Sequence, residues 1–179
     1  LIDDLERTAH AGLNKPDFAV IAVGTTTGQL GASIYLREIS GSEDGAPPQV
    51  DLALERKIGD FVRAQIAGGT VEICHDVSDG GIAIALAEMV LAGGNGITLS
   101  APDAADHGWW FGEDQGRYIL AVDQKDGQKL ISDAREANVP AQQIGISGCE
   151  VLDLGPEGTI SIATLRNAAE AWLATYMDA

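Results

Sequence analysis

The distribution of apolar positions predicts a series of short strands. An apolar run at residues 18–23 is continuous and has the length of a buried strand. A small-residue loop follows at residues 24–31. Residues 149–161 have the pattern of a hairpin around a Gly-Pro-Glu-Gly turn. Further strands of apolar or alternating residues are predicted at 70–73, 97–99, 118–122 and 142–146.

Apolar residues that recur every three or four positions predict four helices. The first follows Asp51 and stops at Gly68 and Gly69, and the second ends at Gly93 and Gly94. The inward positions run from Leu54 to Ile66, from Ile82 to Val90, from Leu130 to Ala134 within residues 126–138, and from Ile162 to Tyr176. Strands joined by helices, with one hairpin beside them, predict an α+β fold with a mixed four- to five-stranded sheet covered by helices.

A chain of 179 residues fits one domain with its own core. We expect that domain at residues 16–179, preceded by an N-terminal arm at residues 1–15 that comes from the boundary of a preceding domain. Residues 1–6 are acidic and have neither an initiator Met nor the pattern of a signal peptide. We therefore expect the chain to be cut from a longer protein.

The charge of the chain limits its partners. Lys and Arg number 11 against 27 Asp and Glu, and the formal net charge is −16. Such a surface repels nucleic acid and anionic membranes, so neither is an expected partner. The longest apolar stretch, residues 82–91, is interrupted by Glu88 and is too short to span a bilayer. Cys74 and Cys149 have no zinc-site spacing, which predicts a reduced, cytoplasmic protein.

The first cluster of candidate chemistry is the polar segment 74–81, predicted to turn from a strand into a helix. Ser78 or Asp79 could cap the helix, and the amides of Gly80 and Gly81 could approach a phosphate. His75 could carry a proton at neutral pH. The alternative is that these residues only cap the helix and satisfy a buried turn.

The second cluster precedes the strand at residues 118–122. If this strand neighbours the one before the polar segment, their carboxylates meet at one edge of the sheet. Carboxylates suit Mg²⁺ bridged to phosphate, and a guanidinium can hold an anion. Glu113 and Arg117 could instead pair with each other. The residues that this edge would gather are Asp76, Asp79, Glu113, Gln115 and Arg117.

Two other features have ordinary structural explanations. The loop at residues 24–31 contains neither a dinucleotide fingerprint nor a Walker A pattern, so a tight turn explains it. Trp109 and Trp110 are predicted to be anchors of a core or an interface, because a tandem aromatic pair buries a large area wherever it lies. The pair is also a candidate for an apolar patch that a preceding part of the protein would cover.

At these motifs the sequence resembles a known family. Residues 75–81 (HDVSDGG), 85–88 (ALAE) and 111–118 (FGEDQGRY) occur in that order, after residues 28–36 (GQLGASIYL) and 47–52 (PPQVDL). They are similar to the last domain of the phosphoribosylformylglycinamidine synthase large subunit, a domain of the aminoimidazole ribonucleotide synthetase C-terminal type. The resemblance covers about residues 16–123.

The resemblance implies a domain of an ATP-dependent ligase of purine biosynthesis. In that reaction the formamide oxygen of formylglycinamide ribonucleotide is phosphorylated, and ammonia from glutamine displaces phosphate to give the amidine. In this family the large subunit carries two copies of an ATP-binding half followed by such a domain. One of the two sites is catalytic and the other is an auxiliary nucleotide site. The present sequence resembles the second copy.

The resemblance also implies roles for the two clusters. Asp76 is the predicted magnesium ligand. The predicted ligand-binding residues are His75, Asp79, Gly80, Glu113, Asp114, Gln115 and Arg117. Asp114 stands where the first copy usually has serine, which adds a negative charge beside an anionic ligand. No catalytic residue is predicted in this chain.

The resemblance finally implies partners. They are the ATP-binding N-terminal part of the same large subunit, a glutaminase subunit and a small adaptor subunit, with ATP and Mg²⁺ used by the whole enzyme. The isolated chain is then expected to be inactive. Two alternatives stay open: a structural module that only supports the neighbouring halves, and a domain of a superfamily member that acts in selenophosphate, thiamine phosphate or hydrogenase maturation chemistry.

Overall fold

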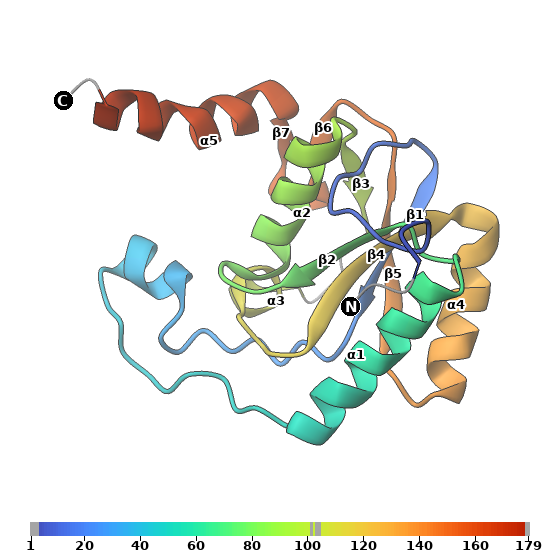
Figure 1. Ribbon diagram of the computed structural model, residues 1–179. Helices are drawn as coiled ribbons and strands as arrows, with labels where there is room; N and C mark the ends of the chain where they lie inside the picture. Colours follow the sequence, from blue (N-terminus) through green and yellow to red (C-terminus); the bar gives the residue numbers. More distant parts are fainter. Residues whose placement is uncertain (1–3, 101, 103–104, 178–179) are drawn as a thin grey trace.

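A computed structural model describes residues 4–100, 102 and 105–177, which form one mixed sheet with helices on both faces (Figure 1). The strands are β1 Phe18–Val23, β2 Ile73–Val77, β3 Ile97–Leu99, β4 Arg117–Asp123, β5 Ala141–Ser147, β6 Val151–Asp153 and β7 Thr159–Ser161. The helices are α1 Leu52–Ala67, α2 Gly81–Gly93, α3 His107–Phe111, α4 Gln124–Glu136 and α5 Ile162–Met177. Two short helical turns are η1 Leu36–Ser40 and η2 Gly155–Glu157.

The strand order of the sheet is β2-β4-β1-β5-β3-β6-β7. Every neighbouring pair is antiparallel except β3 and β6, which are parallel. The predicted α+β class and mixed sheet are confirmed, but the sheet has seven strands rather than four or five. The difference arises because the hairpin of β6 and β7 joins the main sheet through β3 instead of standing apart from it.

The interior strand β1 is buried on both faces, which explains its continuous apolar run. Phe18 and Val20 face one core cluster with α2 and α3, whereas Ala19, Ile21 and Val23 face the other with α1 and α4. Figure 1 shows α2 on the opposite side of the sheet from α1 and α4. The sheet is thus the middle layer between two helical layers.

The edge strand β2 begins later than the sequence predicts. Residues 70–72 do not form a strand, because the amides of Thr70 and Val71 close the end of α1 by donating to the Gln65 carbonyl. The strand continues instead to Val77, with Asp76 opposite Tyr118 of β4. Pairing with β4 therefore overrides the polar composition of residues 74–77, and the turn itself is confined to residues 78–80.

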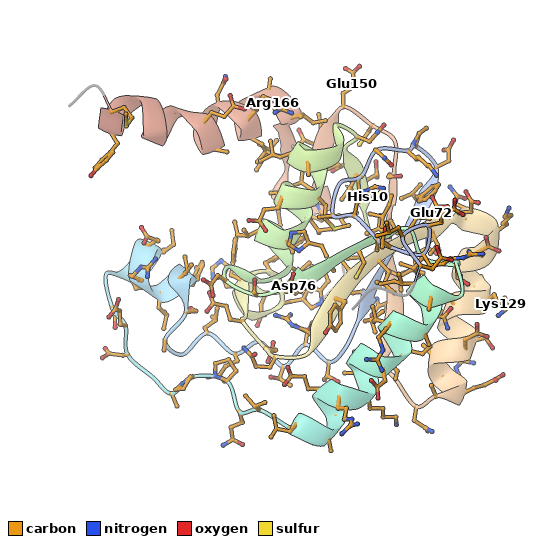
Figure 2. The ribbon with its side chains drawn as sticks, in the orientation of Figure 1. His10, Glu72, Asp76, Lys129, Glu150 and Arg166 are labelled. Atoms are coloured by element: carbon orange, nitrogen blue, oxygen red, sulfur yellow. The ribbon has the colours of Figure 1, made fainter. Side chains whose placement is uncertain are left out.

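Residues 4–15 pack along the outer edge of β2. The His10 amide donates to the Glu72 carbonyl and the Cys74 amide to the His10 carbonyl; Figure 2 shows His10 beside Glu72. Leu13 is fully buried, and its amide donates to the Met89 carbonyl at the end of α2. The edge of the sheet is therefore partly covered by the arm.

The last helix, α5, leaves the body of the molecule beside α2 and β7 (Figure 1). Its first turn is anchored, since Ile162 and Leu165 pack on the core cluster that includes α2. Ala169 is exposed, and the side chains of Trp172 and Leu173 lie outside the described residues. None of the helices in the described part of the chain is long and apolar enough to cross a membrane.

Candidate functional site

Three segments that are far apart in the sequence meet at the end of β2 and the start of β4. They are the loop after β1, the turn before α2 and residues 112–117. The Glu113 carboxylate joins all three, because its Oε1 accepts hydrogen bonds from the amides of Gly80 (2.8 Å) and Ile34 (2.9 Å). The expectation that β2 and β4 are neighbours is therefore met, and both predicted clusters lie at this end of the sheet.

The turn before α2 is built on two glycines. Gly80 and Gly81 both have left-handed backbones, with φ of 76° and 68°. A Cβ on Gly81 would lie 2.6 Å from the Gly112 carbonyl oxygen, so the close approach is to the protein backbone. Neither Ser78 nor Asp79 caps the helix by a side-chain hydrogen bond; the N-cap residue is Gly80. The capping prediction is wrong, because the Glu113 carboxylate takes the Gly80 amide.

Asp114 holds the glycine loop. Its side chain is 9% exposed and accepts hydrogen bonds from the amides of Thr27 (3.2 Å) and Gly28 (3.1 Å) and from the Thr27 hydroxyl. A carboxylate that accepts several N–H and O–H groups is well compensated for its burial. This internal use explains how a negative charge is accommodated at position 114.

Arg117 is the buried cation of the same cluster. Its side chain is 2% exposed and donates to the carbonyls of Gly112 (2.6 Å) and Asp114 (3.0 Å) and to the Thr26 hydroxyl (3.2 Å). Its Nη1 also lies 3.8 Å from the Asp114 carboxylate, so its ion pair is with Asp114 and not with Glu113. Burial lowers the pKa of Arg117, and the charges of Asp114 and Glu113 partly offset this effect. We call Glu113, Asp114 and Arg117 with their partners the clamp.

The four remaining predicted side chains lie outside the clamp, and three of them are exposed. His75 lies mostly buried, with Nε2 3.3 Å from the Glu88 carboxylate and Nδ1 against the Asp76 carbonyl. The Asp76 side chain is 69% exposed and can be found in Figure 2. Asp79 and Gln115 are exposed, and Gln115 donates weakly to the Glu113 carbonyl at 3.4 Å. These four side chains do not converge on a single described partner.

Asp76 belongs to no cluster of three metal-ligating side chains in the part of the chain that the structure describes. Among residues 4–100, 102 and 105–177, no group of three or more His, Cys, Asp or Glu side chains could hold a metal ion. Magnesium often keeps several waters and takes only one or two carboxylates together with substrate phosphates. The exposed Asp76 fits the role of one such ligand and no more.

A cavity of about 430 Å³ lies beside the clamp, between the glycine loop, the start of α1 and the turn before β4. Glu55 contributes a carboxylate from α1, Asp51 contributes one from the N-cap position before that helix, and Gln115 contributes an amide. Sequence reasoning missed this cavity: Asp51 was visible only as the residue before a helix, and nothing marked Glu55. Its lining residues are Thr25, Thr27, Gln29, Pro48, Gln49, Asp51, Leu54, Glu55, Ile58, Asp114, Gln115 and Gly116.

The sequence model of a family described as "AIR synthase related protein, C-terminal domain" matches residues 15–148, which is most of the chain. The chain belongs to this family. The match spans both predicted clusters, the clamp and the cavity. The clamp and the cavity are therefore features of an AIR synthase related C-terminal domain.

Relatives in this family carry the name that the motifs suggested. The chain is 48% identical, over its whole length, to phosphoribosylformylglycinamidine synthase subunit PurL of Rhodopseudomonas palustris (strain BisA53). It is 44% identical over 99% of its length to the protein of that name from Bradyrhizobium sp. (strain ORS 278). The resemblance to this synthase is thus confirmed. The chain spans about a quarter of the length of these relatives.

Solved structures confirm the fold. The chain is similar to "T. maritima PurL complexed with FGAR", with a TM-score of 0.72 at 16% identity over 90% of this chain and 30% of that one. It is also similar to the E. coli hydrogenase maturation protein HypE, with a TM-score of 0.58 at 15% identity over 86% of this chain and 51% of that one. At such identities the likeness shows the AIR synthase related fold and not the chemistry.

Proposed function

We propose that this chain is a domain of a phosphoribosylformylglycinamidine synthase, a carbon-nitrogen ligase of purine biosynthesis. The whole enzyme would use ATP to phosphorylate the formamide oxygen of formylglycinamide ribonucleotide, and ammonia from glutamine would displace the phosphate. The observation that carries the proposal is the 48% identity along the complete chain to a subunit of that name. Relatives at this identity support the ligase more strongly than the fold-level likeness to HypE supports another chemistry.

Within that enzyme the chain would supply part of a site. The ATP-binding portion would come from the N-terminal part of the same subunit, and ammonia from a glutaminase subunit joined through a small adaptor subunit. Solved structures similar to this chain include T. maritima PurL with ATP and with ADP, and "Structure of PurLQS from Thermotoga maritima". These related structures support nucleotide use and assembly with partners, and a cytoplasmic location is consistent with that chemistry.

The residues available to a ligand are those outside the clamp. Asp76 would provide one oxygen ligand to a magnesium ion, which when bound would neutralise nucleotide phosphate charge. His75, Asp79 and Gln115 remain candidates for ligand contact because their side chains are exposed or only partly engaged. Gly80, Glu113, Asp114 and Arg117 would act by holding the turn and the glycine loop in place.

A structural module is the second candidate, and the clamp favours it. Three of the predicted ligand-binding side chains spend their hydrogen bonds on backbone groups of this domain. A domain whose motif residues serve its own fold could support neighbouring domains without touching the substrate. The two candidate functions differ in whether the exposed residues contact a ligand.

The test is steady-state kinetics of the full-length synthase, with formylglycinamide ribonucleotide, glutamine and Mg-ATP. We expect Asp76→Ala or Gln115→Ala to lower kcat or kcat/KM at least about tenfold with unchanged melting temperature. Glu150→Ala, on the exposed turn before β6, is the control and should leave turnover unchanged. The 179-residue chain alone should form no amidine. Full turnover in both variants would favour the structural module, and amidine formation by the isolated chain would contradict the proposed division of labour.

A further inference from the structure

A second cavity, of about 320 Å³, lies between the start of α2, helix α3 and the turn η2. We call it the Trp110 pocket. Its lining is mainly apolar and includes side chains of Ala83, Phe111 and Leu154. Among the described residues, it shares none with the cavity beside the clamp, and none of the residues predicted to bind a ligand or a metal lines it. The Trp110 pocket is therefore separate from the candidate site.

The Trp110 pocket is built around a hydrogen-bond donor that has no acceptor. Trp110 is 5% exposed, and the ring of Trp109 packs edge-on against it, with 4.6 Å between the ring centroids. Its indole Nε1 is the one buried side-chain nitrogen or oxygen without a hydrogen-bond partner in the described part of the chain. Burying such a donor without an acceptor is unfavourable, and a buried tryptophan normally finds one. The described chain thus lacks one acceptor beside an apolar cavity.

The size of the Trp110 pocket fits a single anchoring side chain. A volume of about 320 Å³ is at the lower end of the range for small-molecule sites. All of its lining residues except Trp110 are half-buried or exposed, so they can move aside when a group enters. A peptide offers the required combination, because every residue carries a carbonyl acceptor next to its side chain. Anchors of this kind in closed pockets supply much of the affinity of protein interfaces.

Two carboxylates at this pocket determine the charge of the segment that fits it. Asp106 and Glu157 are both exposed. Asp106 uses Oδ1 to accept from the Trp109 amide (3.0 Å), and the Glu157 carboxylate takes no hydrogen bond or ion pair from the described residues. No Lys or Arg side chain of the described chain lines the pocket. An incoming segment with basic residues is therefore attracted, and an acidic one is repelled.

We propose that the Trp110 pocket docks a basic segment from the rest of the same subunit. An apolar side chain of that segment enters the pocket, and the adjoining backbone carbonyl accepts the indole N–H of Trp110. Flanking Lys or Arg side chains pair with Asp106 and Glu157. The assignment to the same subunit rests on the proposed function, and it agrees with the length of the relatives, of which this chain spans about a quarter.

Nuclear magnetic resonance of the 179-residue chain with 15N-labelled tryptophan reads the indole N–H directly. The probe is the peptide acetyl-Lys-Leu-Lys-amide at constant ionic strength. We expect a saturable downfield shift of the Trp110 indole proton, because that proton gains an acceptor. Acetyl-Glu-Leu-Glu-amide tests the charge and acetyl-Lys-Ser-Lys-amide tests the apolar anchor. Each should bind at least about tenfold more weakly.

Three variants test the contacts separately. Trp110→Phe keeps an aromatic ring but removes the donor, and it should weaken binding of acetyl-Lys-Leu-Lys-amide about fivefold, followed at the Phe111 amide. Glu157→Gln lies on an exposed turn, which preserves the fold, and it should weaken binding about twofold to fivefold. Glu150→Gln removes an equal charge from an exposed residue that does not line the pocket, and should leave the affinity unchanged.

Photo-cross-linking in the full-length synthase tests which segment is docked. With p-benzoylphenylalanine in place of Glu157, mass spectrometry should find a link to a basic segment of the same polypeptide outside these 179 residues. The same group in place of Glu150 should not give that product. A link only within the 179 residues, to a second copy or to another protein would refute the proposed occupant.

Two results in the isolated chain would overturn the docking site itself. One is an indole signal of Trp110 that stays unshifted at saturating acetyl-Lys-Leu-Lys-amide, and the other is equal binding of the acidic peptide. Peptide binding and the expected cross-link in a full-length protein that forms no amidine would leave the docking site standing and refute only the ligase assignment. The failure of one proposal is therefore distinguishable from the failure of the other.

Discussion

Asp114 and Glu55 line the same cavity, yet their carboxylates differ in hydrogen bonding. Asp114 is buried and accepts two amides and a hydroxyl of the glycine loop, whereas Glu55 has no hydrogen-bond partner among the described residues. The first lies in a motif that resembles a ligand-binding segment, and the second lies in an unremarked helix turn. The polar side chains of a recognisable motif can therefore serve to hold the fold together. In this domain the carboxylate without a hydrogen-bond partner among the described residues, that of Glu55, lies on the neighbouring helix α1.

The largest effect is expected at Arg117, the buried cation of the clamp. Arg117→Met keeps much of the side-chain volume but leaves two carbonyls, a hydroxyl and the Asp114 charge without their partner. We expect a loss of about 3 to 5 kcal/mol in the free energy of unfolding, measured by urea denaturation. Arg63→Met on the exposed face of α1 is the control, with an expected change within about 1 kcal/mol. Equal small losses would mean that the clamp does not stabilise the fold.

The next effect concerns the turn on which the clamp acts. Gly81→Ala and Gly94→Ala both place a Cβ on a left-handed backbone, with φ of 68° and 81°. Only the Cβ at Gly81 would meet other atoms, 2.6 Å from the Gly112 carbonyl oxygen, whereas nothing lies within 4 Å at Gly94. We expect Gly81→Ala to cost about 1 to 3 kcal/mol more than Gly94→Ala in thermal unfolding. Similar losses in the two variants would show that residues 110–112 do not pack against this turn.

A smaller effect is expected at Glu113, which joins the turn to the segment after the glycine loop. Glu113→Ala leaves the amides of Gly80 and Ile34 without their acceptor and should cost about 1 to 3 kcal/mol. Glu113→Gln retains an acceptor oxygen and should recover most of that loss. Hydrogen exchange of the two amides, measured in both variants, should rise in the alanine variant only. If the two amides exchanged equally fast in both variants, Glu113 would stabilise the turn through its charge and not through its hydrogen bonds.

Much of the fold could be predicted because its signals are local. The apolar run of β1, the spacing of the helices and the glycine stops all lie within a few residues of the elements they define. The start of β2 was misplaced because the amides of residues 70 and 71 donate to the Gln65 carbonyl at the end of α1. Its end was misplaced because Val77 pairs with Arg117 of β4, 40 positions along the chain. The number of strands was underestimated because the parallel pairing of β3 with β6 has no local mark.

The site was less predictable because its contacts, like the strand pairings, join residues far apart in the sequence. Residues 75–81 and 111–118 were visible as polar motifs, and the resemblance to the synthase pointed to them. The use of Asp114 depends on Thr27, which is 87 positions away in the sequence. Equally, Glu55 becomes notable only once α1 and the turn at Gly116 are seen to enclose a cavity. Roles that arise from long-range contacts need the structure.

The most direct test of the contrast compares two isosteric charge removals in the same cavity wall, Asp114→Asn and Glu55→Gln. Urea denaturation should show a loss of about 1 to 3 kcal/mol for Asp114→Asn, since the new amide turns an N–H group toward donors of the glycine loop. Glu55→Gln should change the free energy of unfolding by no more than about 0.5 kcal/mol. Equal losses, or a larger loss at Glu55, would contradict the assignment of Asp114 to the fold and Glu55 to the open cavity.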